Sequence, residues 1–307
     1  MPPNRGGSSD KMYTVECSQV TKRFKDTAAV DHLSFAIGRG EVFGMVGPNG
    51  AGKTTALRML MDIIQPDDGE IRVLGRPMDE QVKNRLGYLP EERGLYRKLT
   101  VAESLLYLAQ LKDMRPGLAK DRANQLLTRV GMDQHKNKKT EELSKGMGQI
   151  IQFVATILHD PDLLVLDEPF AGLDPVNTEL LKNLVLELKG EGKSIILSTH
   201  MMNQVEELCD RFLMINKGRA VLYGSLDEIK SGFKSNSVFL KCDRIPEGLP
   251  GVIGSKSHGR YVELLLDGGT SPDDVLEALV RARVSVDRFE VSAPSLHEIF
   301  VRVAKGD

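Results

Sequence analysis

The residues best suited to chemistry form a glycine-rich loop, 47–55, whose sequence GPNGAGKTT fits the pattern G-x-x-x-x-G-K-[ST]. Glycines allow backbone N–H groups to turn towards a polyphosphate, and the N-terminus of a following helix adds positive potential. Lys53 can reach the β- and γ-phosphates, and the Thr54 hydroxyl can help to hold Mg²⁺. The candidate phosphate ligands are Gly47, Pro48, Asn49, Gly50, Ala51, Gly52, Lys53, Thr54 and Thr55.

A pair of carboxylates follows a fully apolar run. Residues 163–166 read LLVL, and Asp167 and Glu168 come directly after them. Two adjacent carboxylates at the end of a buried strand repel each other and lose hydration unless a cation is present. We expect Asp167 to hold Mg²⁺ near Thr54, and Glu168 to orient and deprotonate an attacking water.

Alternating apolar and helical segments would position these groups. The apolar run 41–46 precedes the loop as a strand should, and residues 56–64 continue as a helix with one apolar face. Buried strands at 163–167 and 194–198 alternate with helices, which predicts a mainly parallel α/β sheet. Strand-like runs at 13–20 and 28–37 suggest that the sheet is mixed. Thr100-Val101-Ala102-Glu103 is a capping box that opens a helical lobe.

Changes in composition divide the chain. Residues 1–11 are rich in Pro, Gly and Ser and are expected to be a disordered lead-in. Residues 12–234 form the main α/β domain, with a helical subdomain at about 96–160. Residues 235–307 are expected to form a small α+β domain without a catalytic cluster.

Composition limits the function classes. The 307 residues are 41% hydrophobic and 27% charged, with a net charge of −2, which argues against general nucleic-acid binding. There is no run of eighteen apolar residues and no apolar signal core, so we expect no membrane span. The three cysteines form no C-x-x-C pair and indicate reduced thiols in the cytosol.

Three further segments are ambiguous when taken singly. Ser144 and Gly146 could present a hydroxyl and N–H groups to phosphate at a helix start, or Ser144 could be only an N-cap. Asp174, which precedes a proline, reads alone as another helix cap. His200 follows a buried strand, where a single histidine is more often structural.

The order and spacing of all these segments over about residues 13–232 resemble the nucleotide-binding subunits of ATP-binding cassette (ABC) transporters. The resemblance implies a P-loop NTPase cassette in which 47–55 is the Walker A motif and 163–168 the Walker B motif. It assigns catalysis to Glu168, His200 and Lys53, and makes His200 the switch histidine at the γ-phosphate. Residues 143–147 match the family signature, and 171–175, with Asp174, match the D-loop. Phe24 matches the aromatic that stacks on adenine, with a core phenylalanine as the alternative.

Three positions depart from the family pattern, two in the signature and one after the strand-like run 86–89. The signature reads Leu-Ser-Lys-Gly-Met instead of Leu-Ser-Gly-Gly-Gln, and Glu91 occupies the place of a glutamine that senses the γ-phosphate. An ionised carboxylate accepts hydrogen bonds but donates none, so we expect Glu91 to act as a nucleotide or metal ligand. The stretch 90–96 and the tail resemble a branch of prokaryotic exporters similar to sodium-efflux ATPase subunits that carry an accessory domain.

The resemblance implies ATP and Mg²⁺ as cofactors and two cassettes arranged head to tail. Each ATP would lie between 47–55 of one subunit and 144–146 of a copy or a paralogue. A separate transmembrane permease would be the partner, with this chain peripheral on the cytoplasmic face of the membrane and export as the expected direction. The alternative is a soluble ABC-type ATPase of an assembly or regulatory complex. No nucleic-acid partner is expected.

Overall fold

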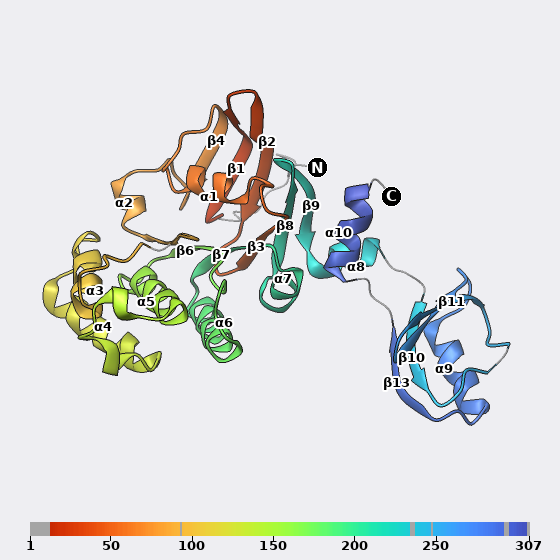
Figure 1. The fold of residues 1–307 in the computed structure, drawn as a ribbon. Coiled ribbons are helices and arrows are strands. Elements are labelled where there is room, and N and C mark those ends of the chain that lie inside the picture. The colour runs from red at the N-terminus through yellow and green to blue at the C-terminus, as the bar shows by residue number, and fades with distance from the viewer. Residues whose placement is uncertain (1–12, 93, 234–236, 247, 292–294, 306–307) are drawn as a thin grey trace. The chain divides into compact units, whose positions relative to one another are not determined.

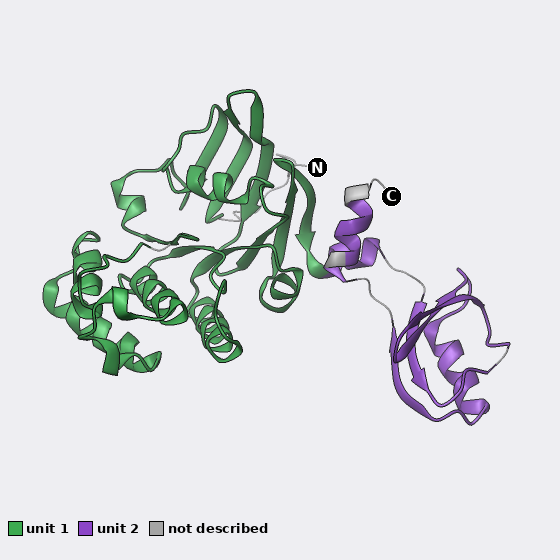
Figure 2. Ribbon diagram, viewed as in Figure 1, with its two compact units in different colours: residues 1–226 green, residues 227–307 purple. Residues whose placement is uncertain are grey.

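The computed structural model describes residues 13–92, 94–233, 237–246, 248–291 and 295–305. The expected lead-in at 1–11 lies outside these residues. Contacts divide the chain into two compact units, Met1–Leu226 and Asp227–Asp307 (Figure 2). This division falls after Leu226, whereas composition placed a boundary near residue 234. No described helix has the length and apolar character needed to cross a membrane.

The main sheet of unit 1 has six strands in the order β5-β6-β7-β3-β8-β9 (Figure 1). Neighbours are parallel except for the β8–β9 pair, which forms an antiparallel hairpin and makes this sheet mixed. Every residue of β3, β6 and β7 is buried, which explains why these strands are almost continuous apolar runs. The strands are β3 (Val42–Val46), β5 (Leu86–Leu89), β6 (Leu163–Asp167), β7 (Ser194–Thr199), β8 (Arg211–Asn216) and β9 (Arg219–Ser225).

The first antiparallel strands form a sheet of their own. β1 (Val15–Phe24) pairs with both β2 (Thr27–Ile37) and β4 (Asp68–Val73), in the order β2-β1-β4. A core cluster joins this sheet to the main one, and the ring of Phe35 stacks on that of Phe43 with centroids 5.7 Å apart. Helix α1 (Lys53–Leu60) buries Leu57 in the same cluster, so the helix that carries Lys53 is held by the core.

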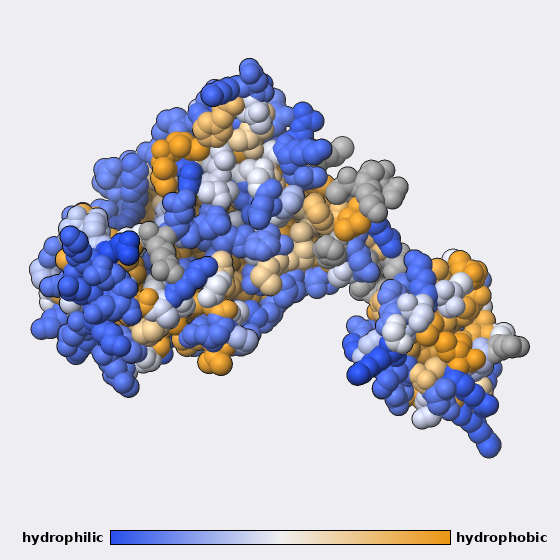
Figure 3. All heavy atoms as spheres, viewed as in Figure 1, coloured by the Kyte–Doolittle hydropathy of each residue, from blue (hydrophilic) through white to orange (hydrophobic). Residues whose placement is uncertain are grey.

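The other helices of unit 1 cover the main sheet or form the helical lobe. The predicted capping box of α3 is confirmed, because the Thr100 hydroxyl accepts from the Glu103 N–H and the Glu103 carboxylate accepts from the Thr100 N–H. Hydrophilic residues cover most of the visible face of this lobe (Figure 3). The helices are α2 (Glu80–Lys83), α3 (Val101–Gln110), α4 (Pro116–Arg129), α5 (Lys145–Ile157), α6 (Pro175–Gly190) and α7 (Met202–Leu208), with 3-10 turns at Asp133–His135 and Thr140–Glu142.

Unit 2 contains a four-stranded antiparallel sheet in the order β11-β12-β10-β13. Val275 and Leu279 of α9 are fully buried in a small core with β10 and β12. Strand β11 was not predicted, because its sequence VIGSKSH is largely polar and exposed and it forms by backbone pairing with β12. The elements are α8 (Leu226–Gly232), β10 (Ser237–Cys242), β11 (Val252–His258), β12 (Tyr261–Leu266), α9 (Pro272–Arg281), β13 (Val286–Val291) and α10 (Leu296–Lys305).

Candidate active site

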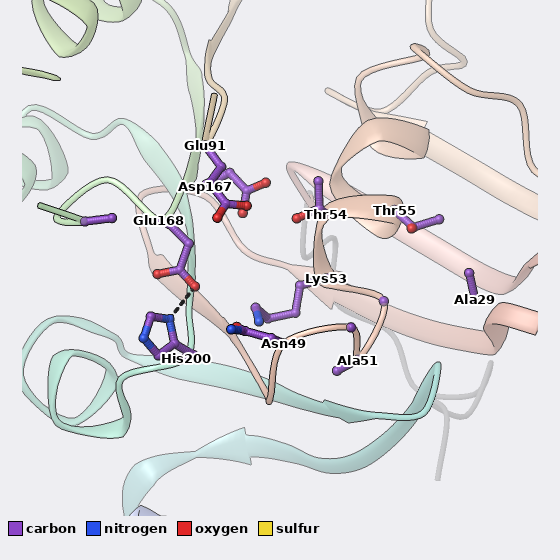
Figure 4. A pocket seen from close by; sticks show the side chains of 13 residues that line it. Ala29, Asn49, Ala51, Lys53, Thr54, Thr55, Glu91, Asp167, Glu168 and His200 are labelled. Carbon is purple, nitrogen blue, oxygen red and sulfur yellow. Dashed lines mark hydrogen bonds and ion pairs between the residues drawn. The ribbon is translucent and has the colours of Figure 1, made fainter. Parts of the chain in front are cut away.

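The candidate site lies at the carboxyl ends of four neighbouring parallel strands. The phosphate loop follows β3, Glu91 follows β5, Asp167 ends β6 with Glu168 next to it, and His200 follows β7. Parallel strands end at the same edge of a sheet, so these side chains converge there. They border a cavity of about 430 Å³ (Figure 4) lined by Ala29, Asn49, Gly50, Ala51, Gly52, Lys53, Thr54, Thr55, Glu91, Asp167, Glu168, Ala171 and His200.

The path of the phosphate loop requires glycine at two positions. Gly52 has φ +108°, and a Cβ atom there would lie 2.3 Å from the Ala29 carbonyl oxygen. A Cβ atom at Gly47 would lie 2.1 Å from the Ile215 carbonyl oxygen. The Gly218 N–H, in the β8–β9 turn, donates to the Ala51 carbonyl at 2.8 Å. The loop is therefore pressed against its neighbours, and its residues 49–55 line the cavity at the start of α1.

Lys53 supplies a cation that is already partly removed from water. Its side-chain ammonium donates to the Gly47 carbonyl at 2.8 Å and to the Pro48 carbonyl at 3.3 Å, and the residue is only 6% exposed. Burial lowers the pKa of Lys53, and the carboxylates of Glu168, Asp167 and Glu91 oppose this shift. An anionic phosphate entering the loop would meet a positive charge held by weak carbonyl contacts that it can replace.

Asp167 places a buried carboxylate at the end of β6. It is fully buried, and neither of its side-chain oxygens has a hydrogen-bond partner among the described residues. Burial raises the pKa of Asp167; the hydroxyls of Ser198 and Thr54 oppose this rise without completing a hydrogen bond to it. Glu91 and Thr54 face the same space (Figure 4). Carboxylate and hydroxyl oxygens are hard donors, so this set fits Mg²⁺.

Glu168 and His200 form a hydrogen-bonded pair. The Nδ1 atom of His200 lies 2.8 Å from a Glu168 carboxylate oxygen, and the Glu168 side chain is 11% exposed against 51% for His200 (Figure 4). Glu168 has φ +49°, a rare value for a residue other than glycine, and its N–H donates to the Ser198 carbonyl at 3.0 Å. Backbone strain of this kind persists where surrounding contacts impose it, often at functional sites. The strained turn aims the carboxylate at the cavity, where it can accept a proton from water.

Several predicted site residues lie outside the cavity lining. Gly47 and Pro48 shape the loop and bind the Lys53 ammonium through their carbonyls. Ser144 caps α5 by accepting from the Met147 N–H at 3.2 Å. Gly146 follows it in the first turn of the same helix. Asp174 caps α6, and its pKa is lowered by the Asn177 N–H.

Phe24 is the last residue of β1 and also does not line the cavity. Its side chain is 50% exposed, and the Lys22 ammonium lies 5.9 Å from its ring centroid. This exposure excludes the alternative of a core phenylalanine, and an exposed ring is free to stack on a planar base.

Two alanines also line the cavity: Ala29, which the sequence did not mark, and Ala171, the first residue of the segment 171–175 that resembles the D-loop. Ala29 lies in β2 and faces the loop from the antiparallel sheet, and its carbonyl is what excludes a side chain at Gly52. Ala171 lies three residues after Glu168 and donates its N–H to the Glu168 carbonyl at 3.1 Å. Small side chains carry no chemical signature, and only the packing of the two sheets brings Ala29 to the cavity.

The fold and the site together define a P-loop ATPase of the cassette type. The family model described as ABC transporter matches residues 30–171, and that of the C-terminal domain of ATP-binding protein DrrA1-3-like matches residues 224–304. The uncharacterized ABC transporter ATP-binding protein YhaQ of Bacillus subtilis (strain 168) is 42% identical over 293 residues, covering 94% of this chain and 97% of that protein.

Two further comparisons also match ATP-binding proteins. The Nod factor export ATP-binding protein I of Burkholderia pseudomallei (strain 1710b) is 38% identical over 214 residues, covering 69% of this chain and 70% of that protein. A solved ATP-binding subunit of an ABC transporter superposes with a TM-score of 0.68 at 30% identity, covering 72% of this chain and 93% of that one. The chain belongs to the ATP-binding proteins of the ABC transporter family and is an ATPase, which confirms the resemblance drawn from its motifs.

Proposed function

We propose that this ATPase hydrolyses Mg²⁺-bound ATP in the cavity described above and thereby powers export through a separate transmembrane permease. The observation that carries the proposal is the buried carboxylate of Asp167, which has no hydrogen-bond partner among the described residues and lies beside the Lys53 loop and the Glu168–His200 pair. Similarity to a protein whose name specifies Nod factor export supports the direction of transport. The substrate would be selected by the permease.

In the proposed mechanism, the loop amides and Lys53 bind the β- and γ-phosphates. Asp167, Thr54 and Glu91 would hold Mg²⁺, which neutralises phosphate charge when bound. Glu168 accepts a proton from the attacking water, whose oxygen forms a bond to the γ-phosphorus as the bond to the ADP oxygen breaks. His200 Nδ1–H donates to Glu168 and keeps its carboxylate oriented. Phe24 stacks on adenine.

The proposed working unit is a pair of cassettes, either two copies or a copy and a paralogue. Ser144 and Gly146 lie outside the cavity of their own chain, as expected if they meet the nucleotide of the facing subunit together with the Asp174 loop. ATP would close the pair at the cytoplasmic face of the membrane, and hydrolysis would release it, which is a switch biased by the γ-phosphate. A soluble ABC-type ATPase of an assembly or regulatory complex is the alternative.

The general-base role is tested with Glu168→Gln, which keeps side-chain shape but removes the proton acceptor. We expect ATP binding to persist and turnover to fall by at least about 100-fold, within the range of general-base catalysis. Mg²⁺-dependent phosphate release and nucleotide titration measure the two effects. Glu141→Gln, at an exposed position outside the cavity, is the matched control. A Glu168→Gln enzyme with wild-type turnover would exclude Glu168 as the base.

Co-purification from detergent-solubilised cells distinguishes a transporter complex from a soluble assembly or regulatory complex. An integral membrane protein recovered in a stable complex with this chain supports transport. Recovery of soluble partners alone, with no membrane protein, favours the assembly or regulatory complex.

A further inference from the structure

Two buried glutamines on helix α5 each donate a side-chain hydrogen bond to a different loop. The side-chain amide of Gln149 donates to the Pro169 carbonyl at 3.1 Å, and that of Gln152 donates to the Glu92 carbonyl at 3.2 Å. The two glutamines are 8% and 5% exposed. They are three residues apart on the helix and therefore neighbours on one face.

Each of these loops carries a carboxylate of the cavity. Pro169 comes directly after Glu168 in the loop that follows β6, and Glu92 comes directly after Glu91 in the loop that follows β5. Each glutamine therefore holds the peptide next to a cavity-lining carboxylate. A neutral amide can do this inside the protein without the desolvation cost of a buried charge.

The first turn of α5 also touches the Glu168 loop further along. A Cβ atom at Gly172 would lie 2.7 Å from Cε of Lys145, so the lysine side chain lies directly over this glycine. A Cβ atom at Gly146 would lie 3.5 Å from Cδ2 of Leu173. The loop is thus held to α5 by side-chain packing in addition to the Gln149 hydrogen bond.

We propose that Gln149 and Gln152 are positioning residues that tie Glu168 and Glu91 to the position of helix α5. This inference rests on the proposed function, because it concerns the placement of the same site's carboxylates. Gln149 sets the distance of Glu168 from the attacking water, and Gln152 sets the placement of Glu91 towards the divalent cation. A shift of α5 therefore changes both carboxylates together, while the Lys53 loop stays anchored to β3 and α1.

The two glutamines affect different steps, which makes the inference testable. Misplacing a catalytic group by about 1 Å can cost up to 100-fold in rate, so loss of the Gln149 bond should lower kcat. Loss of the Gln152 bond should weaken cation binding instead, because Glu91 is a proposed metal ligand and Glu168 the proposed base.

The experiment compares Gln149→Met and Gln152→Met with Gln110→Met. Methionine has a similar length but no amide donor, and Gln110 is an exposed residue of α3 outside the cavity. We expect Gln149→Met to lower kcat about 10- to 100-fold with ATP affinity within about twofold of wild type. We expect Gln152→Met to raise the Mg²⁺ concentration for half-maximal activity about tenfold, with kcat at saturating Mg²⁺ within about twofold. Gln110→Met should change neither quantity.

Two further measurements separate positioning from general damage. Mn²⁺ binding by electron paramagnetic resonance, on ATP-loaded Glu168→Gln protein, should weaken with Gln152→Met and stay unchanged with Gln149→Met. If Gln149→Met fails to fold, Gln149→Asn keeps the amide on a chain one methylene shorter and should still lower kcat selectively.

Equal changes in kcat and cation affinity for both variants, or no change in either, would overturn the inference. A wild-type kcat for Gln149→Asn would do the same. If the wild-type protein shows no Mg²⁺-dependent ATP hydrolysis, the proposed function fails before the glutamines are considered.

Discussion

Two charged side chains at the cavity, those of Asp167 and Lys53, would gain better polar contacts from a bound ligand. Among the described residues, the fully buried Asp167 carboxylate has no hydrogen-bond partner, and the Lys53 ammonium donates to two backbone carbonyls. A buried polar group without a partner costs free energy that a bound ligand can recover. An ionised carboxylate at this position therefore lowers stability, and under the proposed function a bound metal would recover that cost.

The substitution Asp167→Asn tests how much free energy the buried Asp167 carboxylate costs the folded protein. Burial raises the pKa of Asp167 above its ordinary value of 3.8, so ionising this carboxyl costs more in the folded protein than in the unfolded chain. The destabilisation by the ionised group is present at neutral pH and disappears as the pH falls through the raised pKa. We expect the substitution to raise the free energy of unfolding by roughly 1 kcal/mol at neutral pH and to change it little below pH 3.8. Urea unfolding at the two pH values measures this.

The same two proteins are then compared with Mg²⁺ and ATP added. Mg²⁺ with ATP should stabilise the wild-type protein more than the Asp167→Asn protein, because the variant lacks the carboxylate that we propose as a metal ligand. A less stable Asp167→Asn protein in the absence of nucleotide would show that the carboxylate has a stabilising partner and would contradict the prediction.

The reactive residues of the cavity were predictable because their chemistry is rare in sequence. Lys53, Thr54, Asp167, Glu168 and His200 all line the cavity, as does Glu91. Their catalytic and metal-binding roles stay predictions. Ala29 could not be predicted, because a small apolar residue in a strand has no distinguishing pattern.

The cavity residues lie at the ends of strands and helices. The residue at which a helix begins depends on its local cap. Helix α3 begins at a reciprocal pair, in which the Glu103 N–H donates to the Thr100 hydroxyl at 3.2 Å and the Thr100 N–H donates to the Glu103 carboxylate at 2.8 Å. Such caps satisfy N–H groups that the helix leaves free. This helix packs with α4 and α5 in the lobe, so its stability supports the helix that holds both loops.

Thr100→Ala should destabilise the protein without changing its chemistry. We expect the free energy of unfolding to fall by about 1 kcal/mol, the usual cost of removing a helix N-cap, and kcat of the isolated subunit to stay the same. Thermal unfolding and ATPase assays measure the two quantities. Thr128→Ala, at an exposed position inside α4, removes a hydroxyl without removing a cap and should have a smaller effect. Equal losses in both variants would argue against the cap.

At the scale of the whole molecule, the site in one chain is incomplete under the proposed function. The cavity is formed within unit 1, yet Ser144 and Gly146 at the start of α5 do not line it. Unit 2 has its own sheet and core, and Ile253 and Val280 are exposed apolar residues of this unit. Apolar residues are visible on the face of unit 2 that Figure 3 shows. Its match to the C-terminal domain model of DrrA1-3-like ATP-binding proteins makes it a feature shared with such proteins.

Pairing of cassettes is tested with Ser144→Arg in the Glu168→Gln background. Glu168→Gln with ATP and Mg²⁺ should form a stable dimer, because the nucleotide is bound and not hydrolysed. The added arginine should keep the protein monomeric through steric overlap with the facing nucleotide, while ATP still binds the cavity. Light scattering and nucleotide titration measure these outcomes. Thr128→Arg on α4, in the same background, should still dimerise. An undiminished dimer with Ser144→Arg would place Ser144 away from the interface.

Local signals in the sequence were sufficient for the phosphate loop, the two carboxylates at the end of β6 and the capping box of α3. Each depends on residues within a few positions of one another, so residue type and spacing define it. The family resemblance followed from the order of these segments along the chain.

Only the tertiary structure decided which segments meet. The strand order β5-β6-β7-β3 places Glu91, Glu168 and His200 beside the Lys53 loop, although they lie far apart in the chain. Equally apolar strands carry no local record of their neighbours, because pairing depends on long-range packing of the whole sheet. The hydrogen bonds of Gln149 and Gln152 to two loops also arise from this packing, since a buried glutamine in a helix does not specify its acceptor.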